Sequence, residues 1–209
     1  QLHSARTQTF VRMFPRCGVP DAFGSWAEHR AFYETLIETN CIEEFTQVWW
    51  SVRPHHRFGT VEVRICDVQT EPWQALAVMA LAVGLTADLA RAYDAGRLPA
   101  PEKGRTIEEN LWRAIRFGLD GKMVDFAARR EETTVDAIRR LVDRAAPHAD
   151  AAGIGPHLAD VERLLREGNG AQRQARAHQA GATLEEVYAE TVARARATSL
   201  GLAAESREG

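Results

Sequence analysis

Two short segments in which apolar and polar residues alternate constrain the fold of this chain more than any other feature. Between Thr60 and Cys66, every second residue is apolar, which is the pattern of a half-buried strand. The segment from Gln47 to Arg53 alternates in the same way, and a loop of about six residues separates the two. We therefore expect two antiparallel neighbouring strands. In the second strand, Val61, Val63 and Ile65 would be buried, and Glu62, Arg64 and Cys66 would lie on the opposite face.

The charged face of the second predicted strand carries the candidate chemistry. Glu62 and Arg64, two residues apart, would lie roughly 7 Å apart along one face. Such a pair fits a metal ion and the phosphates it carries, because carboxylates bind hard cations and Arg holds phosphate in a fork. Arg53, at the end of the other strand, would lie close to where Glu62 and Arg64 converge. The alternative is a surface strand whose charges face water, which is ordinary in antiparallel sheets.

Helical patterns account for most of the remaining chain. A capping box from Ser25 to Glu28 opens a helix to about Glu38, and after Cys66 we predict only helices. The first of these, from Trp73 to about Ala95 with Thr70 as its N-cap, is apolar on nearly all sides and therefore expected to be buried. The other predicted helices and breaks follow. Helices are expected from a capping box at Thr106 to about Gly118, at 134–146, at 156–167, and at 184–198 after a capping box of Thr183 and Glu186. Breaks between helices are expected at Pro147, at Gly168 to Gly170 and at Gly181. Residues 1–24 are loop-like.

The predicted fold class is therefore α+β, a small antiparallel sheet followed by a helical bundle. Residues 1–70 would form part of a sheet domain, 71–200 a helical region packed on it, and 201–209 a frayed tail. With 209 residues, 45% of them hydrophobic, the chain can bury a substantial core.

Net charge, apolar runs and cysteine content limit the classes of function that we expect. A net charge of -3 gives no electrostatic reason to expect nucleic acid as a partner. The apolar run from Ala75 to Ala87 is shorter than the roughly 20 residues that a bilayer requires, so no membrane span is expected. Three widely spaced cysteines without metal-type pairing are consistent with a reduced, cytoplasmic setting.

The motif around the second strand resembles a known family. Arg53-Pro54-His55, followed by the run from Thr60 to Asp67, resembles the signature of the bacterial carboxylate-amine ligases, also called glutamate–cysteine ligase type 2. The shorter pattern of Glu62, Arg64 and Asp67 also resembles the late catalytic strand of glutamine synthetase. The similarity extends over roughly residues 2 to 180 and includes the segments His3 to Gln8, Pro15 to Pro20, Asn110 to Ala114 and Arg116 to Gly121. The family's early strand with further acidic metal ligands has no match, so the chain resembles the C-terminal half of a longer enzyme.

The resemblance implies an ATP- and Mg²⁺-dependent ligase that joins the γ-carboxylate of glutamate to the amine of cysteine through an acyl phosphate, as in thiol biosynthesis. It assigns Glu62 to the metal and Arg64 to the γ-phosphoryl group. Arg53 would bind phosphate or a substrate carboxylate, and Arg6 and His55 would contact substrate. The implied partners are the missing N-terminal half and, in addition, a second copy in a homodimer. Alone, the chain is expected to be inactive, with a sheet edge that pairs with strands of another polypeptide.

Several alternatives stay open at this point. His55 and His56 fit a solvated loop, Cys66 fits a packed thiol, and Asp67 fits either a turn cap or a partner of Arg64. Arg64 itself fits a salt bridge to Glu62 or Asp67. A ligase with another amine or acid, or a non-catalytic helical interaction module that retains the site strand, would carry the same residues.

Overall fold

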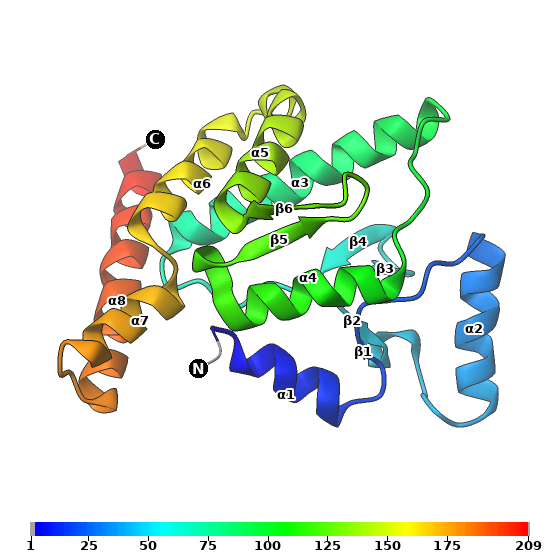
Figure 1. Ribbon diagram of the computed structural model, residues 1–209, viewed down its shortest axis with the longest axis horizontal. Coiled ribbons are helices and arrows are strands. Elements are labelled where there is room, and N and C mark those ends of the chain that lie inside the picture. Colours follow the sequence, from blue (N-terminus) through cyan, green and yellow to red (C-terminus); the bar gives the residue numbers. More distant parts are fainter. Residues whose placement is uncertain (1–2, 209) are drawn as a thin grey trace. The chain divides into compact units, whose positions relative to one another are not determined.

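The computed structural model describes residues 3–208, without the side chains of Arg12 and of residues 198–208. Its α+β composition, with small sheets and several helices, confirms the predicted fold class (Figure 1). By its contacts the chain forms two compact units. Unit 1 comprises Gln1–Asp67 and Ala100–Arg116, and unit 2 comprises Val68–Pro99 and Phe117–Gly209.

Unit 1 contains short strands surrounded by helices. Its elements are α1 (Ala5–Met13), β1 (Cys17–Gly18), α2 (Trp26–Glu38), a 3-10 helix (Phe45–Gln47), β2 (Trp49–Trp50), β3 (Val52–His55), β4 (Thr60–Val63) and nearly all of α4 (Gly104–Phe117). β1 pairs with β2 in parallel, and β3 pairs with β4 antiparallel, which confirms the predicted hairpin. The prediction that residues 1–24 are loop-like is wrong in part, because α1 occupies Ala5–Met13. The chain's first Pro and Gly, which indicated a loop, come only after this helix has ended.

The two faces of the β3–β4 pair are buried in the opposite sense from the prediction. Val61 is 55% exposed and Val63 is 40% exposed, whereas Arg53 is only 6% exposed and Glu62 is half-buried. Alternation identified which residues share a face, but burial depends on what covers that face. Within unit 1, the core cluster of Tyr33, Ile42, Val48 and Trp50 is apolar, and Arg53 bonds to the carbonyl of Val48, one of its members.

Helix α2 begins as the sequence indicates, with Ser25 accepting a hydrogen bond from the backbone N–H of Glu28 at 3.1 Å. The return bond differs, because the Glu28 carboxylate accepts from the N–H of Gly24. On this helix Tyr33 is almost fully buried, while Phe32 is exposed. At α4 the predicted capping box is wrong: the helix begins at Gly104, and the Thr106 hydroxyl donates to the carbonyl of Lys103.

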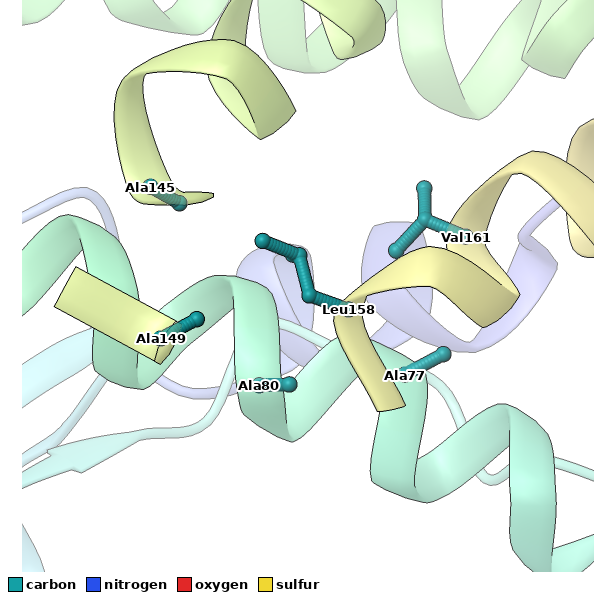
Figure 2. Close-up of a cluster of buried hydrophobic side chains, with 6 residues drawn as sticks. All are labelled: Ala77, Ala80, Ala145, Ala149, Leu158 and Val161. Carbon is teal, nitrogen blue, oxygen red and sulfur yellow. The ribbon is translucent and has the colours of Figure 1, made fainter. Parts of the chain in front are cut away.

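Unit 2 is built around α3. Its elements are α3 (Pro72–Asp94), a 3-10 helix (Gly118–Asp120), β5 (Lys122–Asp125), β6 (Arg130–Thr133), α5 (Thr134–Ala151), α6 (Gly155–Glu167), α7 (Gly170–Gln179) and α8 (Leu184–Glu208). α3 packs against α5 and α6 through small residues, and the cluster of Ala77, Ala80, Ala145, Ala149, Leu158 and Val161 forms the core (Figure 2). At Gly84 a Cβ atom would lie 2.7 Å from the Cβ of Ala145, so the close approach of α3 and α5 requires glycine there.

Several predictions for this unit are wrong for identifiable reasons. The β5–β6 hairpin contradicts the prediction of only helices after Cys66, and its strands give no sequence signal because they carry charges in place of apolar alternation. α5 continues through Pro147, because Ala145 and Ala149 pack on α3 and hold the backbone on either side of it. α7 was missed, although Asn169 and Gln172 form a capping box. The N-cap of α3 is Glu71, not Thr70. α8 continues to Glu208, so the predicted end at 198 is wrong.

The expected burial of α3 on nearly all sides is also wrong. Only the face of Gln74, Ala77, Ala80 and Gly84 is buried, and Met79, Val83 and Tyr93 are exposed. By length and composition alone, α3 is the one helix among the described residues that could cross a membrane. Because core helices of other proteins pass the same test, this finding does not assign a location.

Candidate functional site

The β3–β4 pair brings Arg53, Glu62 and Arg64 together, as the sequence predicted. Arg53 and Glu62 are direct partners in the register. The Nε and Nη2 groups of Arg53 donate to Glu62 Oε2 at 3.0 and 2.9 Å, and Arg64 Nη2 forms an ion pair with Glu62 Oε1. One carboxylate thus lies between two guanidinium groups, and each of its oxygens faces a different arginine.

The guanidinium group of Arg53 is held mainly by hydrogen bonds to other residues of this chain. Besides its two bonds to Glu62, its Nη1 donates to the carbonyl oxygens of Thr46 and Val48 at 2.7 and 2.5 Å. These contacts use four of the five N–H donors of a guanidinium group. The role predicted for Arg53, direct binding of phosphate or a carboxylate, stays a prediction, but the contacts present here fit the positioning of Glu62.

Arg64 and Arg6 line one pocket, which we call the Arg64 pocket. It is lined by Arg6, Thr7, Phe10, Val11, Cys17, Gly18, Trp49, Ser51, Arg64 and Ile65, with a volume of about 130 Å³. Arg64 is anchored through its backbone N–H, which donates to the carbonyl of Ser51 at 2.7 Å. Arg6 Nε donates to Asp67 Oδ1 at 2.8 Å. Asp67 is therefore an ion-pair partner of Arg6, and the sequence did not indicate this pairing.

His55 lies in a different pocket, which we call the His55 pocket. It is lined by Glu44, Phe45, Thr46, Arg53, Pro54, His55, His56, Arg57 and Phe58, with a volume of about 290 Å³. His55 stacks on Phe58 and His56 on Phe45, each with ring centroids 4.5 Å apart. The Nδ1 of His55 and the Nε2 of His56 are buried, and neither has a hydrogen-bond partner among the residues that the structure describes. This combination of aromatic rings and unpaired ring nitrogens suits a flat, polar heterocycle.

A cluster of aromatic and histidine rings supports this pocket. His29 stacks on Trp26 and on His56, with centroid distances of 5.0 and 5.4 Å. Both of its ring nitrogens and the hydroxyl of Tyr33 are buried, and none of the three has a hydrogen-bond partner within the described part of the chain. Burial lowers the pKa of His29, and His56 lowers it further. Burial also lowers the pKa of His56, with smaller contributions from Arg30 and His55.

A magnesium ion bound by Glu62 would need further ligands, because Mg²⁺ prefers several oxygen ligands in octahedral geometry. Within residues 3–208, no group of three His, Cys, Asp or Glu side chains is placed to hold a metal ion. Both oxygens of Glu62 are engaged by arginines. The described residues therefore do not form a magnesium site by themselves, and Glu62 as a metal ligand stays a prediction.

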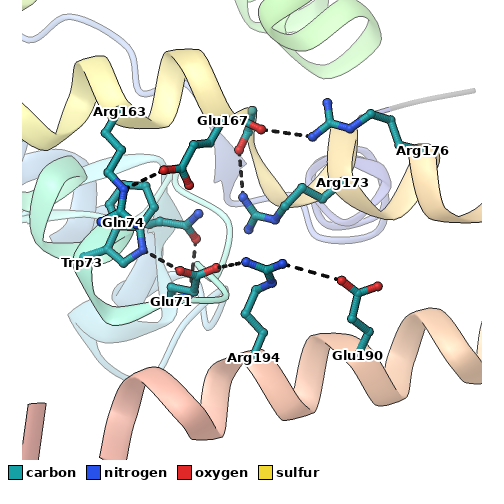
Figure 3. Close-up of polar contacts among 10 residues, drawn as sticks. Glu71, Trp73, Gln74, Arg163, Glu167, Arg173, Arg176, Glu190 and Arg194 are labelled. Carbon is teal, nitrogen blue, oxygen red and sulfur yellow. Dashed lines mark hydrogen bonds and ion pairs between the residues drawn. The ribbon is translucent and has the colours of Figure 1, made fainter. Parts of the chain in front are cut away.

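Unit 2 contains a polar cluster that the sequence did not indicate. Glu71 is 4% exposed, and its carboxylate accepts from Trp73 Nε1 at 2.6 Å and from Arg194 Nη1 at 3.0 Å (Figure 3). Burial alone would raise the pKa of Glu71, but the hydrogen bonds and charges of these partners outweigh it, so the pKa lies below its usual value. The carboxylate joins the start of α3 to α8, which is a structural role.

Residues 1–194 match the model of Glutamate-cysteine ligase family 2. A protein of Solibacter usitatus is 36% identical over 181 residues, which is 86% of this chain and 47% of that protein. One from Sorangium cellulosum is 37% identical over 173 residues, covering 83% and 46% respectively. A third, from Rubrobacter xylanophilus, is 34% identical over 194 residues, covering 93% and 49%. All three are provisionally named glutamate–cysteine ligase 2 or 2-2, and the chain spans about half the length of these curated relatives.

Proposed function

This chain belongs to Glutamate-cysteine ligase family 2, and we propose that it supplies the phosphate-facing part of an ATP-dependent carboxylate–amine ligase. The proposed substrates are glutamate and cysteine. The observation that carries the proposal is the placement of Arg64 between Glu62 and the Arg64 pocket, which it lines together with Arg6. Two guanidinium groups on one small pocket suit phosphate and carboxylate oxygens.

The proposed reaction has two steps. First, the γ-carboxylate oxygen of glutamate attacks the γ-phosphorus of ATP, the bond to the bridging oxygen breaks, and ADP leaves. Second, the amine nitrogen attacks the acyl carbon, the carbon–oxygen bond to phosphate breaks, and the nitrogen loses a proton. In the first step charge spreads over the transferred phosphoryl oxygens, so cationic groups held in place beforehand are the main requirement.

We assign Arg64 to the transferred phosphoryl group and Arg6 to an anionic group of the substrate. Glu62 orients Arg64, and Arg53 in turn fixes Glu62 through its two bonds. The His55 pocket is the proposed site of the nucleotide base, because its stacked rings can hold a flat heterocycle. Mg²⁺ would neutralise phosphate charge in such a reaction. Since the described residues do not form its site, further carboxylates would have to come from the rest of a complete ligase, and none of the assignments above depends on it.

The proposal is tested in the complete ligase with glutamate carrying ¹⁸O in the γ-carboxylate, ATP and cysteine. An acyl phosphate requires that one ¹⁸O atom appear in the released phosphate. Arg64→Ala should reduce this transfer about 10²- to 10³-fold, as for loss of a transition-state partner. Arg139→Ala serves as the control, because Arg139 forms an exposed ion pair with Glu162 in unit 2, outside the residues assigned to the site. Phosphate released without ¹⁸O would overturn the acyl phosphate, because the γ-phosphoryl group would then have been transferred to water. No ATP consumption at all would overturn the proposal and favour a non-catalytic module.

A further inference from the structure

A small cavity of unit 2 lies between α7, α8 and the residue that precedes the N-cap of α3. We call it the Arg173 pocket. Its volume is about 20 Å³, and its lining includes Thr70, Gly170, Arg173, Glu190, Thr191 and Arg194. A cavity of this volume has room for one occupant of about the size of a water molecule. The lining combines two guanidinium groups with one carboxylate, so the chemistry of the occupant depends on how these charges are paired.

Arg173 brings an unsatisfied donor to this pocket. Its Nη1 donates to the carbonyl of Gly168 at 2.8 Å. Its Nη2 is buried and has no hydrogen-bond partner among the residues that the structure describes. A buried donor of a charged group is costly to leave unpaired, so an acceptor from outside the described chain is expected next to Nη2.

The charges around Arg173 do not balance. The ionised side chains of the cluster in Figure 3 are those of four arginines, Arg163, Arg173, Arg176 and Arg194, and three glutamates, Glu71, Glu167 and Glu190. One positive charge is therefore in excess. Glu167 pairs with Arg163 at 2.7 Å. Arg194 pairs with Glu71 at 3.0 Å and with Glu190 at 3.7 Å. Of the two arginines that remain, Arg176 is exposed to water, whereas Arg173 is half-buried.

The surroundings of Arg173 solvate its charge poorly. Burial lowers the pKa of Arg173 below its usual value; Glu71 and Glu167 oppose this shift, and Arg194 and Arg176 add to it. An anion beside the guanidinium group would compensate for the lost water.

The start of α7 favours an anion as well. Gly170, the first residue of this ten-residue helix, lines the pocket, and the positive end of a helix dipole attracts negative charge.

We propose that the Arg173 pocket binds a small monovalent anion, with chloride as its occupant. The anion accepts a hydrogen bond from Nη2 of Arg173 and neutralises the excess charge of the cluster. It thereby joins α7 and α8 to the start of α3. Inorganic phosphate is too large for this cavity, and a water molecule, which fits, leaves the excess charge in place. The site lies within unit 2 and does not depend on the proposed ligase reaction.

Chloride binding is tested on the 209-residue chain by thermal unfolding and by the line width of ³⁵Cl NMR. Sodium chloride replaces sodium gluconate at constant ionic strength, because gluconate is monovalent but too large for the cavity. At about 0.2 M, chloride should raise the melting temperature, followed by far-UV circular dichroism, by about 2 to 4 °C over gluconate. The ³⁵Cl line should be broader than in buffer and should narrow when bromide, an anion of similar size, displaces chloride.

Two variants locate the anion. Arg173→Gln removes the guanidinium group and should abolish both the chloride dependence of the melting temperature and the excess line width. The matched control is Arg139→Gln, which removes an exposed pair with Glu162 in the same unit and should change neither.

Gly170→Ala keeps every charge and adds a methyl group to the lining. The nearest atom to the new Cβ would be the Thr70 hydroxyl oxygen at 3.5 Å, an ordinary contact, so this variant should fold. Because the methyl group takes up space in a cavity of one small occupant, chloride should bind about tenfold more weakly or worse.

The outcomes decide between an anion and water. Equal melting temperatures in chloride and gluconate, without excess line width, would overturn the proposal and leave water as the occupant. A chloride effect that persists undiminished in Arg173→Gln or in Gly170→Ala would place the anion elsewhere and also overturn it. If Arg173→Gln does not fold, Gly170→Ala decides the matter alone.

Discussion

Arg53 and Glu62 lie opposite each other in the β3–β4 register, and two N–H groups of Arg53 donate to a single oxygen of Glu62 at 2.9 and 3.0 Å. Arg53 is nearly buried, so its charge has little water to replace these bonds. The second oxygen of Glu62 contacts Arg64, which lines a pocket. The position of the pocket arginine therefore depends on a buried residue that is itself held by backbone carbonyls of residues 46 and 48.

Replacing Arg53 should destabilise unit 1 strongly. Arg53→Met keeps much of the side-chain volume but leaves Glu62 and two carbonyl oxygens without their donor. Breaking a buried ion pair in this way costs roughly 3 to 5 kcal/mol. Urea unfolding followed by tryptophan fluorescence measures the loss, since four of the five tryptophans lie in unit 1.

The matched control is Arg30→Ala, which removes an exposed i,i+4 pair on α2. Its effect should stay below about 1 kcal/mol. If both substitutions lower the free energy of unfolding equally, the buried hydrogen bonds of Arg53 stabilise unit 1 no more than an exposed ion pair does.

Acidification should weaken unit 1 through His29 and His56. The pKa values of both are lowered, mainly by burial, so the folded state binds fewer protons than the unfolded chain once the pH falls below the unfolded pKa of about 6.5. Their contribution to stability is complete above that pH and is lost progressively as the pH falls through the folded pKa values. Each histidine can add at most about 1.4 kcal/mol per pH unit to the slope.

Unfolding free energies between pH 8 and pH 5 test this expectation. His29→Phe should make the pH dependence shallower, because it removes one of the two protonation sites. His178→Gln, at an exposed position of unit 2, should leave the dependence of unit 1 unchanged. Parallel pH profiles for the parent and His29→Phe would contradict the assignment.

Local sequence signals predicted much of the fold. The β3–β4 hairpin, α2 with its Ser25 cap and the capping box of Thr183 and Glu186 all formed as expected, because each depends on residues close in the chain. The charged β5–β6 hairpin and the passage of α5 through Pro147 could not be predicted in this way. The hairpin strands carry charges in place of apolar alternation, and α5 continues through Pro147 because its neighbouring residues pack on α3, a segment distant in sequence.

The site was predictable in part for the same reason. Period-two alternation and the hairpin register place Glu62 near Arg53 and Arg64, and this convergence formed. Which face of the hairpin is buried could not be predicted, because alternation shows which residues share a face but not which face other segments cover. The bonds from Arg53 to the backbone of residues 46 and 48 also had no sequence signal, since any residue type offers a carbonyl.

Gly84→Ala should destabilise unit 2, although alanine favours helices over glycine by up to about 1 kcal/mol. The new Cβ would lie 2.7 Å from the Cβ and 2.9 Å from the carbonyl oxygen of Ala145, so α3 and α5 would have to separate. Overpacking of this kind costs about 1 to 3 kcal/mol. Thermal unfolding measures it, with Gly104→Ala in α4 as the control, because nothing lies within 4 Å of a Cβ there. A melting temperature of Gly84→Ala at or above that of the parent would show that the two helices can separate at little cost.

Glu62→Gln distinguishes two roles for this residue in the complete ligase. Glutamine keeps the shape of the side chain but cannot pair its charge with Arg53 and Arg64, and ligation should fall about 10²- to 10³-fold. If Glu62 mainly orients Arg64, the Mg²⁺ concentration for half-maximal activity should stay within about twofold of the parent, and Arg64→Ala should add little further loss because both changes remove one interaction. If Glu62 binds the metal, the Mg²⁺ requirement should rise at least tenfold. The engagement of both Glu62 oxygens by arginines favours the first result, and a variant with more than half of the parent activity would contradict both roles.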